Sequence, residues 1–186
     1  MSTVASTRWG DEMPNGRRLV LLRHAKAEAA GRVPDELRRL QPRGWRQGMA
    51  VGAGLSQAGL VPDTVLVSSA VRARETWEKV AEALGEEPEP DVIVSDELYG
   101  AGAEEVVELI RGTEGRVRTL LVVGHEPAMS ATAAYLAGSG EPTHLAQVRT
   151  GLPTAAYAAL WVEAPWSGLE HLGAVLRDVV RPAWPE

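Results

Sequence analysis

An arginine and a histidine, Arg23 and His24, directly follow the apolar residues 19–22. A short apolar run of this kind is typical of a β-strand buried on both faces, as in a parallel sheet. Such sheets bind ligands outside the carboxyl ends of their strands, where this pair is expected to lie. The planar arginine fork matches a phosphate or a carboxylate, and a histidine can be a nucleophile, an acid, a base or a metal ligand. Taken alone, the pair would more often be exposed basic residues at a strand end, because short motifs frequently occur by chance.

Polar side chains of the same kinds follow two other predicted strands. Arg72 comes one turn into the helix after residues 64–67, and His125 comes just after residues 119–123. Because the carboxyl ends of parallel strands meet at one edge of a sheet, these side chains and the first Arg-His pair should line one crevice. The helix that Pro127 opens would point its N-terminus at the same place. Two guanidinium groups, two imidazole rings and a helix N-terminus predict a site for a tetrahedral phosphoryl dianion.

Other site chemistries fit the sequence less well. The chain has no cysteine, and its histidines are not paired at helical spacing: they are His24, His125, His144 and His171. Arginines beside a divalent cation are also unfavourable, so no metal is predicted. Gly52 and Gly54 fall inside a predicted helix, no Gly-Lys-Ser/Thr sequence ends a glycine-rich loop, and no Gly-x-Ser-x-Gly elbow is present. His144 and His171 are expected to be ordinary loop or edge residues, and Arg43 and Arg74 surface residues.

A histidine nucleophile is the remaining interpretation. A neutral imidazole can attack phosphorus and become phosphohistidine, which divides one displacement into two. Neighbouring arginines disfavour the imidazolium form, so His24 should be neutral and reactive near pH 7. The same arginines would hold the equatorial oxygens as charge spreads in the transition state.

Strands and helices alternate along the chain, which predicts a three-layer α/β/α sandwich around a mostly parallel sheet. The strands are expected near residues 18–22, 64–67, 92–94, 119–123, 155–162 and 174–180. The helices are expected near residues 42–59, 71–84, 104–111 and 127–136. The last two strands should extend the sheet at an edge, where an antiparallel arrangement is possible, although residues 174–180 also fit a helical face. Residues 138–151 are predicted to be a polar loop.

Two further features concern the first part of the chain. Residues 25–41 form a connection that is too long for an ordinary strand-to-helix turn, and loops of this length are often functional. The helix that follows carries Trp45, Met49, Ala53 and Ser56 along one side.

The composition limits the class of protein. The 186 residues suggest one domain, residues 17–186, after a polar N-terminal tail, residues 1–16. A net charge of −6 argues against a general nucleic-acid or membrane-surface binder. The chain lacks cysteine, a signal peptide and a long apolar run, and we therefore expect a cytoplasmic protein.

Three segments in order resemble the motifs of the histidine phosphatases, the phosphoglycerate-mutase-like superfamily. They are Leu-Arg-His-Ala at 22–25, Ser-Ser-Ala-Val-Arg-Ala-Arg-Glu-Thr at 68–76 and Val-Gly-His-Glu-Pro at 123–127. The compact length, Ala25 in place of the usual glycine, and Arg-Arg-Leu-Gln-Pro-Arg-Gly at 38–44 are most similar to the SixA-like phosphohistidine phosphatase branch. Gln41 replaces the Thr or Ser usual in that branch.

The resemblance implies that His24 is the nucleophile and that Arg23, Arg72 and His125 bind the phosphate, with no metal or cofactor. Glu97 aligns best with the acidic residue that many relatives carry, and is either a general acid or a solvated carboxylate. The implied substrate is protein phosphohistidine. The alternatives are a small-molecule phosphomonoesterase acting on a sugar or nucleotide phosphate, and a module that binds phosphate without turnover. A mutase is disfavoured, because no inserted segment could hold a phosphoglycerate.

Overall fold

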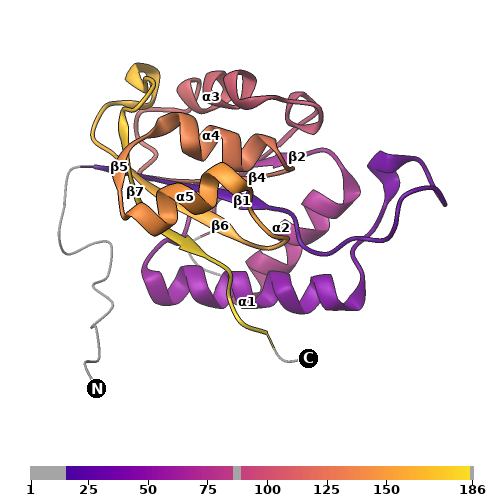
Figure 1. The fold of residues 1–186 in the computed structure, drawn as a ribbon. Coiled ribbons are helices and arrows are strands. Elements are labelled where there is room, and N and C mark those ends of the chain that lie inside the picture. The colour runs from indigo at the N-terminus through magenta and orange to yellow at the C-terminus, as the bar shows by residue number, and fades with distance from the viewer. Residues whose placement is uncertain (1–15, 86–88, 185–186) are drawn as a thin grey trace.

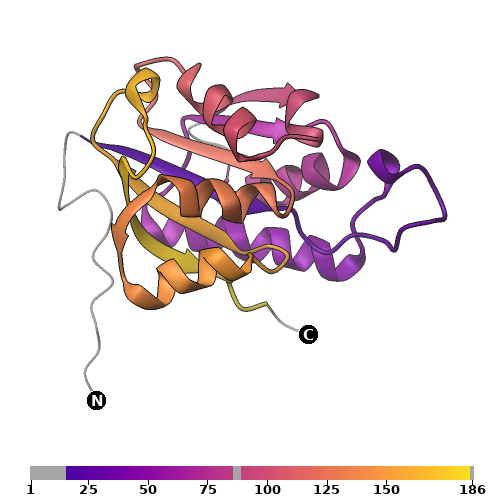
Figure 2. The same ribbon diagram turned by 45° about the horizontal axis from the view of Figure 1, so that its top comes forward.

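A computed structural model describes residues 16–85 and 89–184 of the chain, so the tail predicted for residues 1–16 lies almost wholly outside the described residues. Seven strands form one sheet in the order β3-β2-β4-β1-β6-β7-β5. Helices cover both faces of this sheet (Figures 1 and 2). The three-layer α/β/α sandwich predicted from the sequence is therefore confirmed.

The strands are β1 Arg17–Arg23, β2 Thr64–Ser68, β3 Asp91–Ser95, β4 Thr119–Gly124, β5 Ala137–Gly140, β6 Tyr157–Val162 and β7 Ala174–Val180. The α-helices are α1 Pro42–Ala58, α2 Val71–Leu84, α3 Ala103–Arg111, α4 Ala128–Leu136 and α5 Pro142–Thr150. Three short 3-10 helices are η1 Asp35–Leu37, η2 Glu97–Tyr99 and η3 Trp166–Gly168. Among the described residues, no helix is both long and apolar enough to cross a membrane.

Strands β1, β2, β3 and β4 pair in parallel and make the part of the sheet that carries the site. Side chains of β1 alternate between the two cores: Leu19 and Leu21 pack with α3 and α4, whereas Val20 and Leu22 pack with α1 and α2. Each of these four leucine and valine side chains is fully buried. Burial on both faces explains why the run is continuously apolar rather than alternating.

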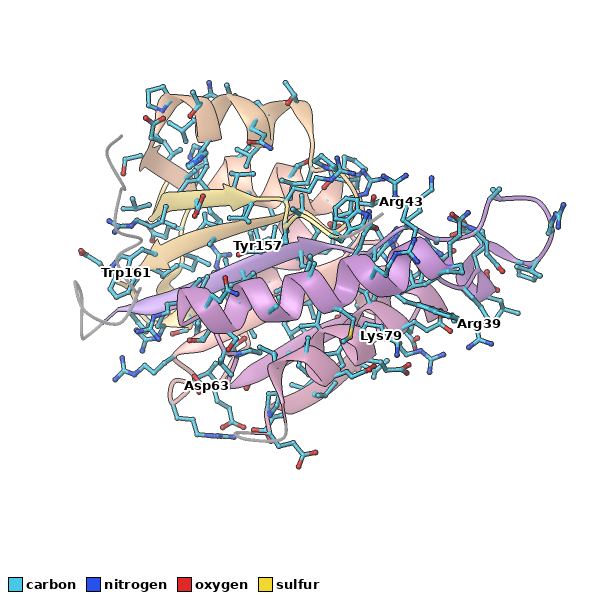
Figure 3. All side chains as sticks on the ribbon, turned by 90° about the horizontal axis from the view of Figure 1, so that it is seen from below. Arg39, Arg43, Asp63, Lys79, Tyr157 and Trp161 are labelled. Carbon is cyan, nitrogen blue, oxygen red and sulfur yellow. The ribbon has the colours of Figure 1, made fainter. Side chains whose placement is uncertain are left out.

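Helix α1 packs against α2 through its glycines. A Cβ atom on Gly48 would lie 2.7 Å from Cβ of Lys79, and one on Gly52 would lie 2.3 Å from the carbonyl oxygen of Val80. Figure 3 shows α1 across this face with Lys79 beside it. The close approach turns the side with Trp45 and Met49 toward solvent, where both are exposed. Val51 and Leu55 of the same helix are fully buried in the core, so only part of the apolar surface of α1 faces solvent.

The second half of the chain departs from one prediction. Residues 138–151 are not a polar loop, because they contain most of β5 and all of α5. Helix α5 begins with Pro142, and the Glu141 side chain accepts a hydrogen bond from the backbone N–H of Thr143. Strand β5 pairs in parallel with β7 at the outer edge of the sheet, where little apolar side-chain area is needed. Polar, short elements at an edge leave no clear hydrophobic period in the sequence.

The closing strands follow the prediction. Residues 174–180 form strand β7, not a helix. Strand β6 pairs antiparallel with both β1 and β7, so the two strands extend the parallel part of the sheet on the side of β1.

Candidate active site

The two histidines meet because β1 and β4 are neighbours in register. Arg23 is opposite Gly124 at the ends of these strands, so His24 and His125 are the next residues along each. The backbone N–H of His24 donates to the carbonyl of Gly124 over 3.0 Å. The centres of the two imidazole rings are 5.2 Å apart. Residues 101 positions apart in the sequence thus become adjacent through strand pairing alone.

Arg72 lies between the two rings. It comes from the first turn of α2, just beyond β2, and it is almost fully buried. Its Nε atom is 3.2 Å from Nε2 of His24, and its Nη2 atom is 3.4 Å from Nδ1 of His125. The structure therefore brings His24, Arg72 and His125 together, as the sequence predicts.

The hydrogen bonds assign a tautomer to each ring. Nδ1 of His24 is 2.8 Å from the carbonyl oxygen of Ala25, which can only accept, so Nδ1 carries the proton. Nε2 of His24 then has a lone pair directed at Arg72. Nδ1 of His125 accepts from Arg72, so its proton lies on Nε2, which donates to Oγ of Ser68 over 2.7 Å. In the sequence, Ser68 is part of a motif and has no assigned role. In the structure, its hydroxyl group orients His125.

Both rings are neutral near pH 7. Burial, with smaller contributions from the charges of Arg72 and Arg23, lowers the pKa of His24 to about 3. Burial, followed by the charge of Arg72, lowers the pKa of His125 to about 4. A neutral ring with a free lone pair is the nucleophilic form of histidine.

Arg23 completes the cationic side of the site. Its Nη1 donates to the carbonyl oxygen of Leu152 over 2.7 Å, which fixes the direction of the guanidinium group. Its Nε atom is buried and has no hydrogen-bond partner in the described part of the chain. A buried donor without a partner is unfavourable unless a ligand satisfies it, and an oxyanion would do so.

The backbone beside His24 is held by two side chains of the helices. The buried Thr76 of α2 accepts from the N–H of Ala25 over 3.0 Å and donates to the carbonyl of Arg72 over 2.6 Å. Gln47 of α1 accepts from the N–H of Lys26 over 2.8 Å. Thr76 bonds to the backbone of Arg72 and to the backbone of Ala25, the residue after His24. It therefore fixes His24 and Arg72 relative to each other.

Two residues that the sequence did not single out reach the site. The carboxylate of Asp35, from η1 in the long loop, is 3.0 Å from Nη2 of Arg72. Tyr99, from η2, donates its hydroxyl to Asp35 over 2.7 Å and places its ring edge-on to His125. The only sequence signal for Asp35 was the unusual length of its loop, and for Tyr99 its place two residues after Glu97.

The remaining candidates lie apart from this cluster. Glu97 is exposed in η2, and within the described residues its carboxylate has no hydrogen bond or ion pair. Arg43 and Arg74 are exposed, as expected. His144 lies 3.7 Å from Asp178, and His171 packs on Tyr135. In the described part of the chain, no group of three or more histidine, aspartate or glutamate residues could hold a metal ion.

Comparison with known proteins fits this geometry. Residues 19–102 match the family described as histidine phosphatase superfamily (branch 1). A structure assigned as the phosphohistidine phosphatase SixA of Nakamurella multipartitia is 31% identical, with a TM-score of 0.78 over 90% of this chain and 96% of that one. The chain belongs to the histidine phosphatase superfamily. Within the superfamily it is SixA-like.

Two further relatives are similar to this histidine phosphatase over most of their length. A structure assigned as SixA from Agrobacterium tumefaciens is 30% identical, with a TM-score of 0.73 over 89% of this chain and 98% of that one. The uncharacterized protein ML1117 of Mycobacterium leprae is 37% identical over 160 residues, which are 83% of this chain and 96% of that one. The family match and the two SixA structures identify the protein as a phosphatase that uses a histidine nucleophile.

Proposed function

We propose that this histidine phosphatase hydrolyses protein phosphohistidine and that His24 is its nucleophile. In the first step, the Nε2 lone pair of His24 attacks phosphorus, and the bond from phosphorus to the substrate imidazole breaks. The electron pair of that bond stays on the departing nitrogen. Arg23 and Arg72 hold the phosphoryl oxygens and balance the negative charge that spreads over them. In the second step, water attacks phosphorus, the bond to Nε2 breaks, and inorganic phosphate leaves.

The observation that carries the substrate class is the protonation state of the carboxylates around the site. The hydrogen bonds from Tyr99 and Arg38 hold the pKa of Asp35 far below its usual range, so Asp35 is an anion and has no proton to give. Among the described residues, the Glu97 side chain makes no hydrogen bond or ion pair with the four pocket residues. A site without a protonated carboxyl group suits a leaving group that departs without a proton. An imidazole that already carries a proton on its other ring nitrogen can leave without a further proton, whereas an alkoxide needs one.

The surroundings of the site support a protein substrate over a metabolite. Val33 and Leu37 in the loop and Trp45 at the start of α1 are exposed apolar side chains. Arg39 and Arg43 lie at the same end of the molecule, as Figure 3 shows. Exposed apolar residues among arginines are typical of surfaces that bind another protein, and they stand out on a chain with a net charge of −6.

Two experiments test the proposal separately. Labelled substrate followed by quenching should leave acid-labile, base-stable phosphate on the protein, and His24→Ala should carry none. His171→Ala is the matched control, since His171 is exposed and outside the site, and it should label like the parent. Equal labelling of His24→Ala would assign the nucleophile elsewhere.

The substrate class is tested by comparing kcat/KM on a phosphohistidine protein, a sugar phosphate and a nucleotide monophosphate. The proposal expects phosphohistidine to be preferred by at least about 100-fold, which corresponds to the loss of general acid catalysis on the esters. A preference for either ester would make the protein a small-molecule phosphomonoesterase. Saturable phosphate binding without turnover would make it a binding module.

A further inference from the structure

The long loop of residues 25–41 returns to the active site instead of leading away from it. Its two ends are held together by a bridge between Ala27 and Leu40 and by a hydrogen bond from the N–H of Gln41 to the carbonyl of Lys26. The part between these ends projects beyond the carboxyl end of β1, as Figure 2 shows. Helix η1 lies in this projecting part and brings Asp35 back onto Arg72.

Asp35 is fixed from several directions. Its Oδ1 atom accepts from Nε of Arg38 over 2.8 Å, and its Oδ2 atom accepts from the hydroxyl of Tyr99 and from Nη2 of Arg72. Its backbone carbonyl accepts from Nη1 of Arg72 over 2.7 Å. Arg72 faces His24 with Nε and faces Asp35 with both Nη atoms. The guanidinium group of Arg72 therefore lies between Asp35 and His24, the proposed nucleophile.

The charge of Asp35 is unusual for this position. An anion bound beside the phosphate-holding arginine repels a second anion, whether a phosphoryl dianion or a developing alkoxide. It attracts a leaving group that carries an N–H or a positive charge. The Asp35 side chain is 47% exposed, so a substrate group can reach it.

We propose that Asp35 is a specificity-determining residue that accepts a hydrogen bond from the ring N–H of the departing imidazole. This inference rests on the proposed phosphohistidine activity. The substrate ring is bonded to phosphorus through one nitrogen and protonated on the other. When the P–N bond breaks, its electron pair remains on the first nitrogen, and the ring leaves as neutral imidazole with its N–H still on the second. No proton is transferred in this step, so an ionised carboxylate can assist it.

The test compares Asp35→Asn with the parent on two substrates, phosphohistidine and p-nitrophenyl phosphate. Asp35→Asn should lose about 10- to 100-fold in kcat/KM on phosphohistidine, as for the loss of a charged hydrogen-bond partner. On p-nitrophenyl phosphate, whose leaving group has no N–H, the variant should be unchanged or faster. Glu36→Gln is the matched control, because it removes one negative charge from the next, exposed residue of η1. It should leave the ratio of the two substrates unchanged.

Other outcomes separate this inference from the proposed function. Equal losses of Asp35→Asn on both substrates would mean that Asp35 only positions Arg72, and would overturn the inference. Equal gains would mean that Asp35 competes with the phosphate for Arg72, which also overturns it. In both cases the parent would still prefer phosphohistidine, and the proposed function would stand. A parent enzyme that prefers p-nitrophenyl phosphate to phosphohistidine would contradict both the proposed function and the inference about Asp35. A melting curve of each variant distinguishes these results from loss of folded protein.

Discussion

Arg72 donates its Nε–H group to Nε2 of His24, the nitrogen that attacks phosphorus in the proposed mechanism. The lone pair of the nucleophile is therefore engaged by the same side chain that is expected to bind the phosphoryl group. When a phosphoryl oxygen takes over this N–H, the lone pair becomes free to attack. The contact orients the ring and links substrate binding to release of the nucleophile.

Arg72→Ala should lower kcat by about 10²- to 10³-fold, as for the loss of one preorganised donor. Arg72→Lys should recover only part of this loss, because an ammonium group cannot contact both rings with a planar fork. Steady-state kinetics on p-nitrophenyl phosphate and inhibition by vanadate measure both effects. Arg74→Ala, two residues along the same helix and exposed, should behave like the parent. An active Arg72→Ala enzyme would exclude this residue from the phosphate site.

The low pKa values of the two histidines predict the acid limb of the pH profile. His24 titrates near 3 and His125 near 4 in the free enzyme, so both stay neutral as the pH falls from 8 to about 5. After correction for substrate ionisation, kcat/KM should be flat over this range and should decline only as the pH approaches 4. A decline centred near 6.5, the ordinary value for histidine, would show that burial does not hold the rings neutral.

The lowered pKa of His24 also predicts how the stability of the protein depends on pH. The folded state keeps His24 unprotonated, whereas the unfolded chain takes up a proton as the pH falls below about 6.5. The contribution of His24 to stability is therefore complete above the unfolded pKa and is lost progressively toward about 3. At pH 5 the loss is on the order of 2 kcal/mol.

Melting temperatures at pH 7 and pH 5 measure this effect. His24→Asn should show a smaller decrease between the two pH values than the parent does, because asparagine does not titrate. His171→Asn, at an exposed position, should show the same decrease as the parent. A His24→Asn decrease equal to that of the parent would contradict the assignment.

Thr76→Val should affect both folding and catalysis. Valine matches the shape of threonine but removes the acceptor of the Ala25 N–H, which is buried. An unsatisfied buried N–H costs about 1–3 kcal/mol of folding free energy. Because His24 is the preceding residue, kcat should also decrease, with a smaller change in KM. Thr76→Ser keeps the hydroxyl and should recover most of both losses, whereas a parent-like Thr76→Val would show that this contact does not position the nucleophile.

Glu97→Gln distinguishes the two roles considered for this carboxylate. Its side chain is exposed and, among the described residues, makes no hydrogen bond or ion pair with the pocket. The substitution should therefore change kcat/KM by less than about threefold on phosphohistidine and on alkyl phosphates. Asp96→Asn, the neighbouring exposed acid, is the control. A loss of about 10²- to 10⁴-fold confined to alkyl phosphates would identify Glu97 as a general acid and would favour a small-molecule phosphatase.

The convergence of Arg23, His24, Arg72 and His125 could be predicted because each residue directly follows, or lies one turn beyond, a strongly apolar strand. Parallel strands place their carboxyl ends at one edge, so position in sequence translates into position in space. The same strand signals predicted the three layers. The error at residues 138–151 has the opposite cause: β5 and α5 lie at the sheet edge and need only a few apolar residues, such as Val148, to pack.

The sequence by itself determined the three layers, the sheet apart from its edge strand β5, and the residues at the strand ends. Buried elements show a regular order and period of apolar residues, which can be recognised in the sequence. Only the tertiary structure decided the tautomers of His24 and His125 and the placement of Asp35 and Tyr99. Those features depend on hydrogen bonds between segments far apart in the chain, such as Asp35 to Tyr99 over 2.7 Å. A loop of polar residues has no hydrophobic period, so its path is set by the partners that its side chains find after the strands have assembled.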